Sequence, residues 1–174
     1  MSRETLEINY THLDTPVGKL MIGSSERGLC KVSFALEVDA EFFSWLEDHF
    51  QNAIFKENRK KSDPYLKAID GYFGGKVRRF DFKLDLIAKG FRRNALLALS
   101  KVPYGKAVSY GELAALAGSP RAARAAGSAC ASNPIAIVIP CHRVIGTGGG
   151  IGGYGGGLHH KRYLLKMEGI DFKE

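Results

Sequence analysis

SYGELAALAGSPRAARAAGSACA, residues 109–131, is the stretch that decides the fold of the second half of this chain. Ser109 is a good cap for a helix that runs to Ala117 and ends at Gly118. Ser119-Pro120 then opens a second helix at once, because proline is well tolerated in a first helical turn. Two short helices joined by a tight, glycine-containing turn form a helix-turn-helix.

The second of these helices combines small residues with two arginines. Arg121 and Arg124 are three residues apart, so we expect them to share a helix face. The helix has almost none of the long polar side chains that read base edges in the major groove. It therefore favours a minor-groove or backbone contact with arginine as the inserting group. The alternative is an alanine-rich helix packed inside the protein, which would bury two arginines without partners.

The positive charge of the chain is concentrated in this half. Residues 1–86 hold 13 Lys and Arg against 14 Asp and Glu, a net charge of −1, whereas residues 87–174 hold 12 against 4, a net charge of +8. A basic half-chain indicates a polyanionic partner, usually nucleic acid. A solvated basic surface that only aids solubility is the alternative.

Composition excludes several other classes of protein. The chain is 45% apolar, enough for a buried core, yet no apolar run approaches the 18 or so residues that span a bilayer. The charged N-terminus lacks an apolar signal-peptide core. Three widely spaced cysteines, Cys30, Cys130 and Cys141, indicate reduced thiols rather than a disulfide framework. We expect a cytoplasmic protein with no membrane partner and no metal site.

The first half predicts a small antiparallel sheet with helices. Three β-rich segments separated by turn residues predict a meander, at residues 7–12, 18–23 and 28–34. Apolar spacing predicts a helix over residues 39–50. After a polar connector at residues 56–61, Ser62 or Asp63 would cap a second helix with Pro64 in its first turn. No nucleophile, base or metal ligands cluster here, so we interpret residues 1–86 as a scaffold and residues 87–174 as the functional domain.

The strongest candidate nucleophile follows an apolar, β-branched run at residues 135–139, which we expect to form a buried strand. Cys141 is next to His142, a candidate base, and Arg143, a cation, and a positive neighbourhood lowers the pKa of a thiol. Adjacent residues of an extended chain point in opposite directions, so His142 would need a water or a bent backbone to reach the sulfur. An inert, buried cysteine is the alternative.

Nine of the twelve residues from Gly146 to Gly157 are glycine. The match to a dinucleotide-binding fingerprint within this loop is weak, because only 21 residues follow Gly153, too few for the rest of that motif. A loop that must lie close to a bulky ligand explains the glycines better. We expect no cofactor.

These residues resemble one family. PCHRVIG, residues 140–146, resembles the active-site signature of the O6-alkylguanine-DNA alkyltransferases, which repair DNA by direct reversal. The likeness covers essentially all of residues 91–170 in the same order and spacing. It includes Ser109-Tyr110, residues 113–118 and 120–127, Asn133-Pro134, Gly152, Tyr154, residues 156–158, Lys161, Leu164-Leu165 and Glu168-Gly169.

The resemblance implies a catalytic role for four matched positions. Cys141 would accept the alkyl group, and His142 would take the thiol proton through a water. Glu168 would orient His142 and stabilise its charge. Asn133 would hold the turn beside the strand.

The resemblance also implies how DNA is bound. Arg124 would fill the gap left by a flipped nucleotide, and Tyr110 would lie near the guanine and the rotating phosphate. Gly127 and its neighbours, with Arg121 and Ser128 among the contacts, would line the minor groove of double-stranded DNA.

The alkylguanine pocket implied by the resemblance is framed by Tyr110, the ring of Tyr154, the carbonyls of Cys141 and Val144, and the amide of Gly155. Gly155 departs from the family, where serine is common, and this removes a hydroxyl that could bond to O6. Apolar residues predict a helix over residues 91–101, and residues 89–95 lack a glutamine and a tryptophan that the family often has near this helix.

As a whole, the resemblance implies an α+β protein with a ribonuclease H-like first domain and a mostly helical second domain. Its activity would be that of a methylated-DNA–[protein]-cysteine S-methyltransferase. It would move the alkyl group of a flipped O6-alkylguanine, with O4-alkylthymine as a further candidate substrate, irreversibly to Cys141. Each molecule would act once, as a monomer without a cofactor.

Three other interpretations stay open on the residues alone. A helix-turn-helix regulator would bind specific DNA sequences without using Cys141. A cysteine hydrolase using Cys141 and His142 would turn over. A relative that binds lesions without transfer would leave the sulfur unmodified.

Overall fold

The computed structural model describes residues 5–35 and 39–174, so the first four residues of the polar N-terminus lie outside the described part. The chain divides into two compact units, Met1–Ile87 and Ala88–Glu174. Within the described residues, no helix combines the length and apolar character needed to cross a membrane.

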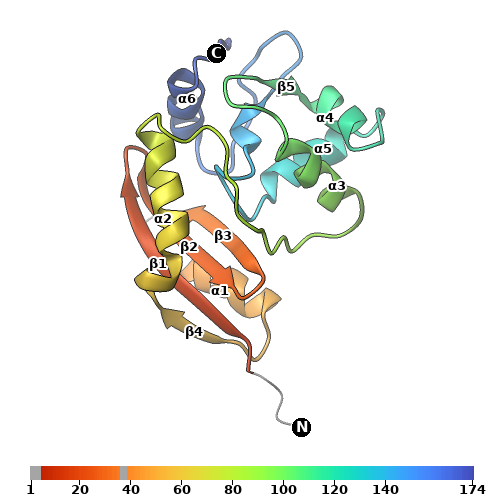
Figure 1. Ribbon diagram of the computed structural model, residues 1–174. Helices are drawn as coiled ribbons and strands as arrows, with labels where there is room; N and C mark the ends of the chain where they lie inside the picture. The colour runs from red at the N-terminus through yellow and green to blue at the C-terminus, as the bar shows by residue number, and fades with distance from the viewer. Residues whose placement is uncertain (1–4, 36–38) are drawn as a thin grey trace. The chain divides into compact units, whose positions relative to one another are not determined.

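The first unit is built on a four-stranded sheet (Figure 1). The predicted antiparallel meander is confirmed, with strand order β3-β2-β1-β4. Its elements are β1 (Glu7–Thr15), β2 (Gly18–Ser25), β3 (Gly28–Phe34), α1 (Ala40–His49), β4 (Ile54–Glu57) and α2 (Arg59–Phe73). β4 was not predicted and pairs in parallel with the edge of β1.

Both faces of this sheet are buried, because successive side chains of a strand point to opposite sides. Met21 of β2 packs in one cluster with Phe42 and Leu46 of α1. Its neighbours Leu20 and Ile22 are fully buried toward the other face, where α2 lies against β1 and β2 (Figure 1).

The predicted start of the second helix is wrong. α2 begins at Arg59, within the segment expected to be a connector, because the side chain of Asn58 accepts a hydrogen bond from the backbone N–H of Lys61 and caps the helix. Pro64 therefore lies inside the helix rather than at its start. Ser62, expected as a cap, instead donates its hydroxyl to the carbonyl of Asn58.

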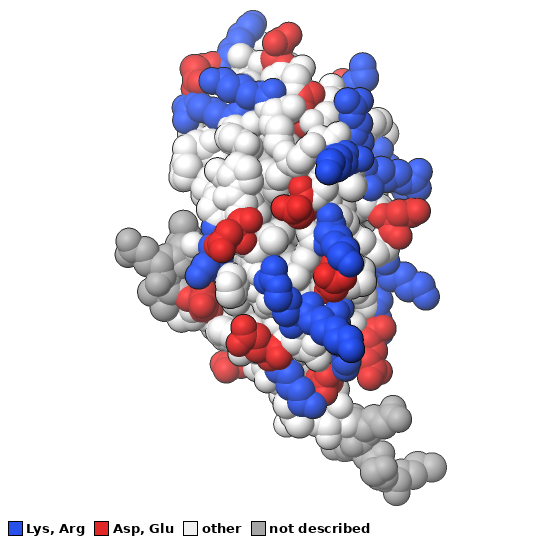
Figure 2. Space-filling view, turned by 60° about the vertical axis from the view of Figure 1, so that its left-hand side comes forward, with Lys and Arg blue, Asp and Glu red and all other residues white. Residues whose placement is uncertain are grey.

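Charged side chains of the first unit are largely balanced. Glu7 of β1 accepts hydrogen bonds from Lys56 and Lys61, and these contacts lower the pKa of its carboxyl to about 2. Figure 2 shows basic and acidic side chains interspersed over one face of the molecule.

The second unit is mostly helical, as predicted. It contains α3 (Gly90–Leu99), β5 (Val108–Ser109), α4 (Tyr110–Leu116), α5 (Ala123–Ala131), the short 3-10 helix η1 (Cys141–Arg143), β6 (Val144–Ile145) and α6 (Leu158–Met167). Ser109 caps α4 as expected, in a capping box with Glu112. β5 and β6 pair in parallel, which joins the start of the helix-turn-helix to the segment after Cys141.

Two local expectations in this unit are wrong. α5 starts at Ala123, so Arg121 lies in the turn before the helix and shares no helical face with Arg124. Residues 135 and 137–139 are buried, but the segment forms a tight turn rather than a strand. The N–H of Ile139 bonds to the carbonyl of Ile135, and Ile137 has a positive φ of 70°.

Gly28 supplies a test of the first unit. Its φ is +136°, and a Cβ atom there would come within 2.3 Å of the Lys83 carbonyl oxygen. We expect Gly28→Ala to lower the free energy of unfolding by roughly 3 kcal/mol or more, from backbone strain plus overpacking. Gly75→Ala is the control, since φ is also positive but nothing lies within 4 Å. It should cost only about 1–2 kcal/mol in urea unfolding. Equal losses in the two variants would contradict the packing argument.

Candidate active site

Cys141 lies at the first position of η1 with 7% of its surface exposed. The amide of Asn133 donates to its sulfur over 3.2 Å and to the carbonyl of Ile139 over 2.7 Å. The side-chain oxygen of Asn133 also accepts the N–H of Ile135. A single side chain thus contacts both the turn and the thiol.

The charge state of this thiol differs from the expectation. Burial raises the pKa of Cys141, opposed by the Asn133 amide, by the positive charge of Lys161 and by a hydrogen bond from Tyr154. The prediction that the adjacent His142 and Arg143 lower the pKa is wrong, because both are directed at a carboxylate instead. The resting thiol is therefore protonated and needs a base to become a nucleophile.

That carboxylate is Glu168, the C-cap residue of α6, and it is fully buried at its side chain. It accepts hydrogen bonds from His142 Nε2 at 2.7 Å and from Arg143 Nε and Nη2 at 2.8 and 2.9 Å. The backbone N–H of Gly105 donates to it as well. Such a paired, multiply bonded charge is what burial requires.

This arrangement defines the protonation state of His142. A carboxylate accepts, so Nε2 carries the proton and Nδ1 is the basic nitrogen. Burial lowers the pKa of His142, and the contact with Glu168 opposes that shift. The ring is therefore neutral near pH 7 and is able to take a proton. The 3-10 turn supplies the bent backbone that an adjacent Cys and His need.

Sequence reasoning gave no role to two residues that build the site. Lys161 has no exposed surface, and its ammonium donates to the carbonyls of Val144 and Gly153 at 2.6 and 3.1 Å. Arg143 was treated only as a nearby cation, yet it also donates to the carbonyl of Val102. A signal for Lys161 existed, because it repeats with Leu164, Leu165 and Glu168 at the spacing of one helix face.

A pocket of about 210 Å³ opens beside the sulfur. It brings together the predicted Tyr110, Gly127, Tyr154 and Gly155 with Cys141, and adds Cys130, Ala131 and Gly153. Most of these residues are small, and the two tyrosines supply ring surface. The thiol therefore faces a slot suited to a flat, apolar-faced ligand. Val144, which was also expected to frame the pocket, is not among its lining residues, and its carbonyl accepts a hydrogen bond from Lys161.

Cys130 is a second thiol in this pocket, and burial raises its pKa to about 12. No amide or imidazole is bonded to it in the part of the chain that the structure describes. The two thiols are thus distinguished by their partners, and only Cys141 has an adjacent base.

Helix α5 presents three kinds of surface. Ala126 and Ala129 are buried against the core, while Gly127 and Cys130 line the pocket. Arg124 and Ser128 are exposed, as is Arg121 in the preceding turn. One short helix thus joins a cationic outer face to the wall of the thiol pocket.

No group of three or more potential metal ligands occurs among residues 5–35 and 39–174. The fold and site together define a class of protein, in which a cysteine with an adjacent His–Glu pair lies in a slot walled by a helix-turn-helix.

Comparisons with known proteins agree with that class. Residues 90–170 match the family described as "6-O-methylguanine DNA methyltransferase, DNA binding domain", and residues 8–86 match "6-O-methylguanine DNA methyltransferase, ribonuclease-like domain". A methylated-DNA–protein-cysteine methyltransferase of Methanosarcina acetivorans is 38% identical over 165 residues, covering 92% of this chain and 97% of the relative. One from Mycolicibacterium paratuberculosis is 39% identical over 161 residues, with 92% of each chain covered.

Solved structures of O6-methylguanine methyltransferases have a similar fold. The Mycobacterium tuberculosis O6-methylguanine methyltransferase superposes with a TM-score of 0.80 at 35% identity, over 92% of both chains. A structure of M. tuberculosis OGT in complex with DNA gives 0.78 at 34% identity, over 93% of this chain and 92% of that one. The chain belongs to the O6-methylguanine-DNA methyltransferase family.

Lys161→Met tests the electrostatics of the site. Loss of the buried ammonium removes a charge that favours the thiolate, so the pKa of Cys141 should rise further. The measurement is the rate of iodoacetamide modification of the Cys141 peptide against pH, read by mass spectrometry. Lys166→Met, an exposed change on the same helix, should leave the profile unchanged. A profile that Lys161→Met does not shift would contradict this role.

Proposed function

We propose that this protein repairs O6-alkylguanine in DNA by transferring the alkyl group irreversibly to the sulfur of Cys141, once per molecule. The observation that carries the proposal is the buried thiol, held by Asn133 beside a neutral His142 and opening on a slot lined by two tyrosines. Family membership, and relatives whose names state the methylated-DNA–protein-cysteine methyltransferase activity, support it.

The chemistry requires only groups that the chain supplies. His142 Nδ1 takes the thiol proton through a water, and Glu168, itself held by Arg143, accepts a hydrogen bond from Nε2 and stabilises the ring as it becomes charged. The thiolate then attacks the sp³ carbon on O6, so an S–C bond forms while the C–O6 bond breaks. The electron pair returns to guanine, where the Tyr110 hydroxyl and the Gly155 amide stabilise it.

The product explains the single turnover. A thioether has no carbonyl for water to attack, so no step within the site regenerates the thiol. The same chemistry applies to O4-alkylthymine, which we propose as a further candidate substrate.

The target carbon is inaccessible inside a duplex, so we propose that the base is flipped into the slot. Arg124 is exposed on α5, the helix that also forms the slot wall, and from the minor groove it would fill the vacated stack. Arg121, Gly127 and Ser128 would contact the backbone nearby. We also propose that the protein acts as a monomer and that it acts in the cytoplasm.

Cys141→Ala tests the acceptor. We expect this variant to bind DNA and to lose all methyl transfer. Intact-protein and peptide mass spectrometry after incubation with O6-methylguanine DNA should show one added methyl, on the Cys141 peptide of the wild-type chain. Repeated turnover would indicate a hydrolase, and an unmodified wild-type protein would indicate a lesion binder or a regulator.

Arg124→Ala tests flipping. It should slow the repair of duplex DNA at least tenfold and leave reaction with free O6-benzylguanine nearly unchanged. Arg121→Ala removes the same charge outside the helix, so it should weaken salt-dependent binding without that selective loss. Equal losses on both substrates for Arg124→Ala would count against insertion.

The pH dependence of transfer tests the base. Because burial lowers the pKa of His142 below 6.5, the rate should stay constant as pH falls to 6.5 and decline only below it. Glu168→Gln removes a contact that raises this pKa, so the acid limb should move to still lower pH while the maximal rate falls. Single-turnover rates on methylated DNA measure both, and an acid limb above pH 6.5 would rule out His142 as the base.

A further inference from the structure

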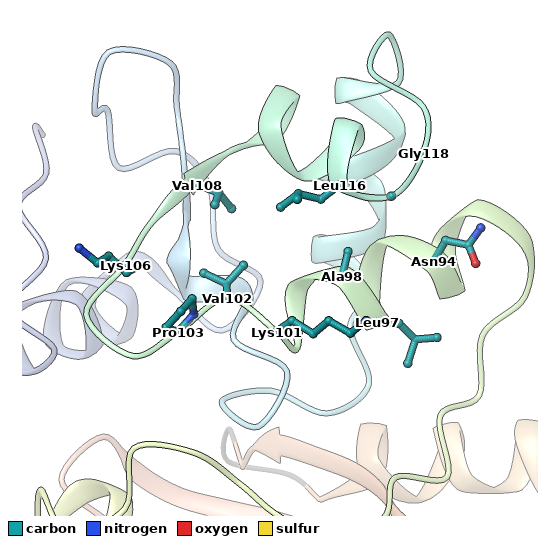
Figure 3. Close-up of a pocket in the computed structure, with 11 residues that line it drawn as sticks. Asn94, Leu97, Ala98, Lys101, Val102, Pro103, Lys106, Val108, Leu116 and Gly118 are labelled. Atoms are coloured by element: carbon teal, nitrogen blue, oxygen red, sulfur yellow. The ribbon is translucent and has the colours of Figure 1, made fainter.

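The second unit has a hollow that is separate from the thiol pocket. A groove of about 720 Å³ runs between α3, the segment after it and the end of α4. Figure 3 shows Val102, Val108 and Leu116 converging on this space, with Lys106 at one end and Asn94 at the other. None of its lining residues lines the thiol pocket or belongs to the proposed DNA contacts.

The groove exposes apolar surface that a folded chain usually buries. Leu116 is 61% exposed and Leu97 is 38% exposed, and both are among the few large hydrophobic side chains at the described surface. Ala98, Val102 and Pro103 extend the apolar lining between them. Contiguous apolar surface in a groove is typical of a binding site for another chain.

The charged residues of the groove have one sign. Lys101 and Lys106 lie at its edge, and neither forms an ion pair with a described residue. The lining contains no acidic residue, so the positive charge of the edge is not compensated locally. A ligand that matches this surface has an apolar face flanked by carboxylates.

From this complementarity we propose that the groove binds an amphipathic peptide segment of a partner protein, with apolar anchors at helical spacing and acidic residues beside them. Leu97 and Leu116 contact the anchors, and the two lysines face the carboxylates. Because the groove and the thiol pocket share no residue, the partner binds while DNA occupies the other surface. A partner bound in the groove thus recruits the repair protein without blocking alkyl transfer.

The binding test uses the full chain and two labelled peptides with the same pattern of leucines at positions i, i+3, i+4 and i+7. One peptide has glutamate at its polar positions and the other lysine. Fluorescence anisotropy should show at least tenfold tighter binding of the glutamate peptide, weakened by added salt. Amide chemical shifts should change at Leu97, Leu116 and Ala117 and not at the residues of the thiol pocket.

Variants locate the site. Binding of the glutamate peptide should become at least tenfold weaker in Leu116→Glu. It should weaken as much in the double variant that combines Lys101→Glu with Lys106→Glu. Ile54→Glu changes another exposed hydrophobic residue outside the groove and should have no effect. Thermal unfolding of each variant checks that it is folded, and transfer to free O6-benzylguanine should stay unchanged with saturating peptide.

Three results would overturn the proposal. These are equal binding of the two peptides or binding of neither, chemical shifts confined to other surfaces, and self-association in sedimentation that Leu116→Glu abolishes, which would assign the groove to a second copy. None of them bears on alkyl transfer, so failure here is distinct from failure of the proposed function.

Discussion

The buried carboxylate of Glu168 is the interaction on which the rest of the second unit depends. It binds His142 and Arg143 of the same 3-10 turn and the backbone N–H of Gly105, so one residue at the end of α6 fixes two other segments. Arg143 also donates a hydrogen bond to the carbonyl of Val102. Removing one partner from such a group leaves an uncompensated charge in the interior, which typically costs about 3–5 kcal/mol. The same contacts that stabilise this unit therefore set the tautomer and position of the base.

A second constraint is that the site must be buried and yet open to a large ligand. Burial raises the pKa of the Cys141 thiol and lowers that of His142, which favours the neutral form of both groups. Lys161 ties β6, the strand after Cys141, to the glycine loop through the carbonyls of Val144 and Gly153. Small residues on α5 and in the glycine loop leave space for a nucleobase. Different residues thus make the site rigid and leave it open. The hydrogen bonds of buried polar side chains fix the segment around Cys141, and small residues line the slot.

Much of this could be predicted from sequence, and the failures have physical causes. The helix-turn-helix, the cap at Ser109 and the meander follow from local signals that the structure obeys. The start of α2 was missed because the cap is Asn58, while Pro64 is a more conspicuous signal further along. Residues 135–139 look like a strand because they are apolar and β-branched, yet Asn133 satisfies their backbone as a turn. The roles of Arg143 and Lys161 depend on acceptors far away in sequence, which spacing alone does not specify.

The amide of Asn133 has a consequence for the spent protein. The same nitrogen donates to the acceptor sulfur and to the carbonyl that closes the neighbouring turn. A carbon substituent on that sulfur adds volume in a closely packed interior, where neighbours must yield to accommodate it. Any displacement of the sulfur would act on the backbone through this shared donor. Alkylation of Cys141 is thus expected to change the contacts of Asn133 as well as one covalent bond.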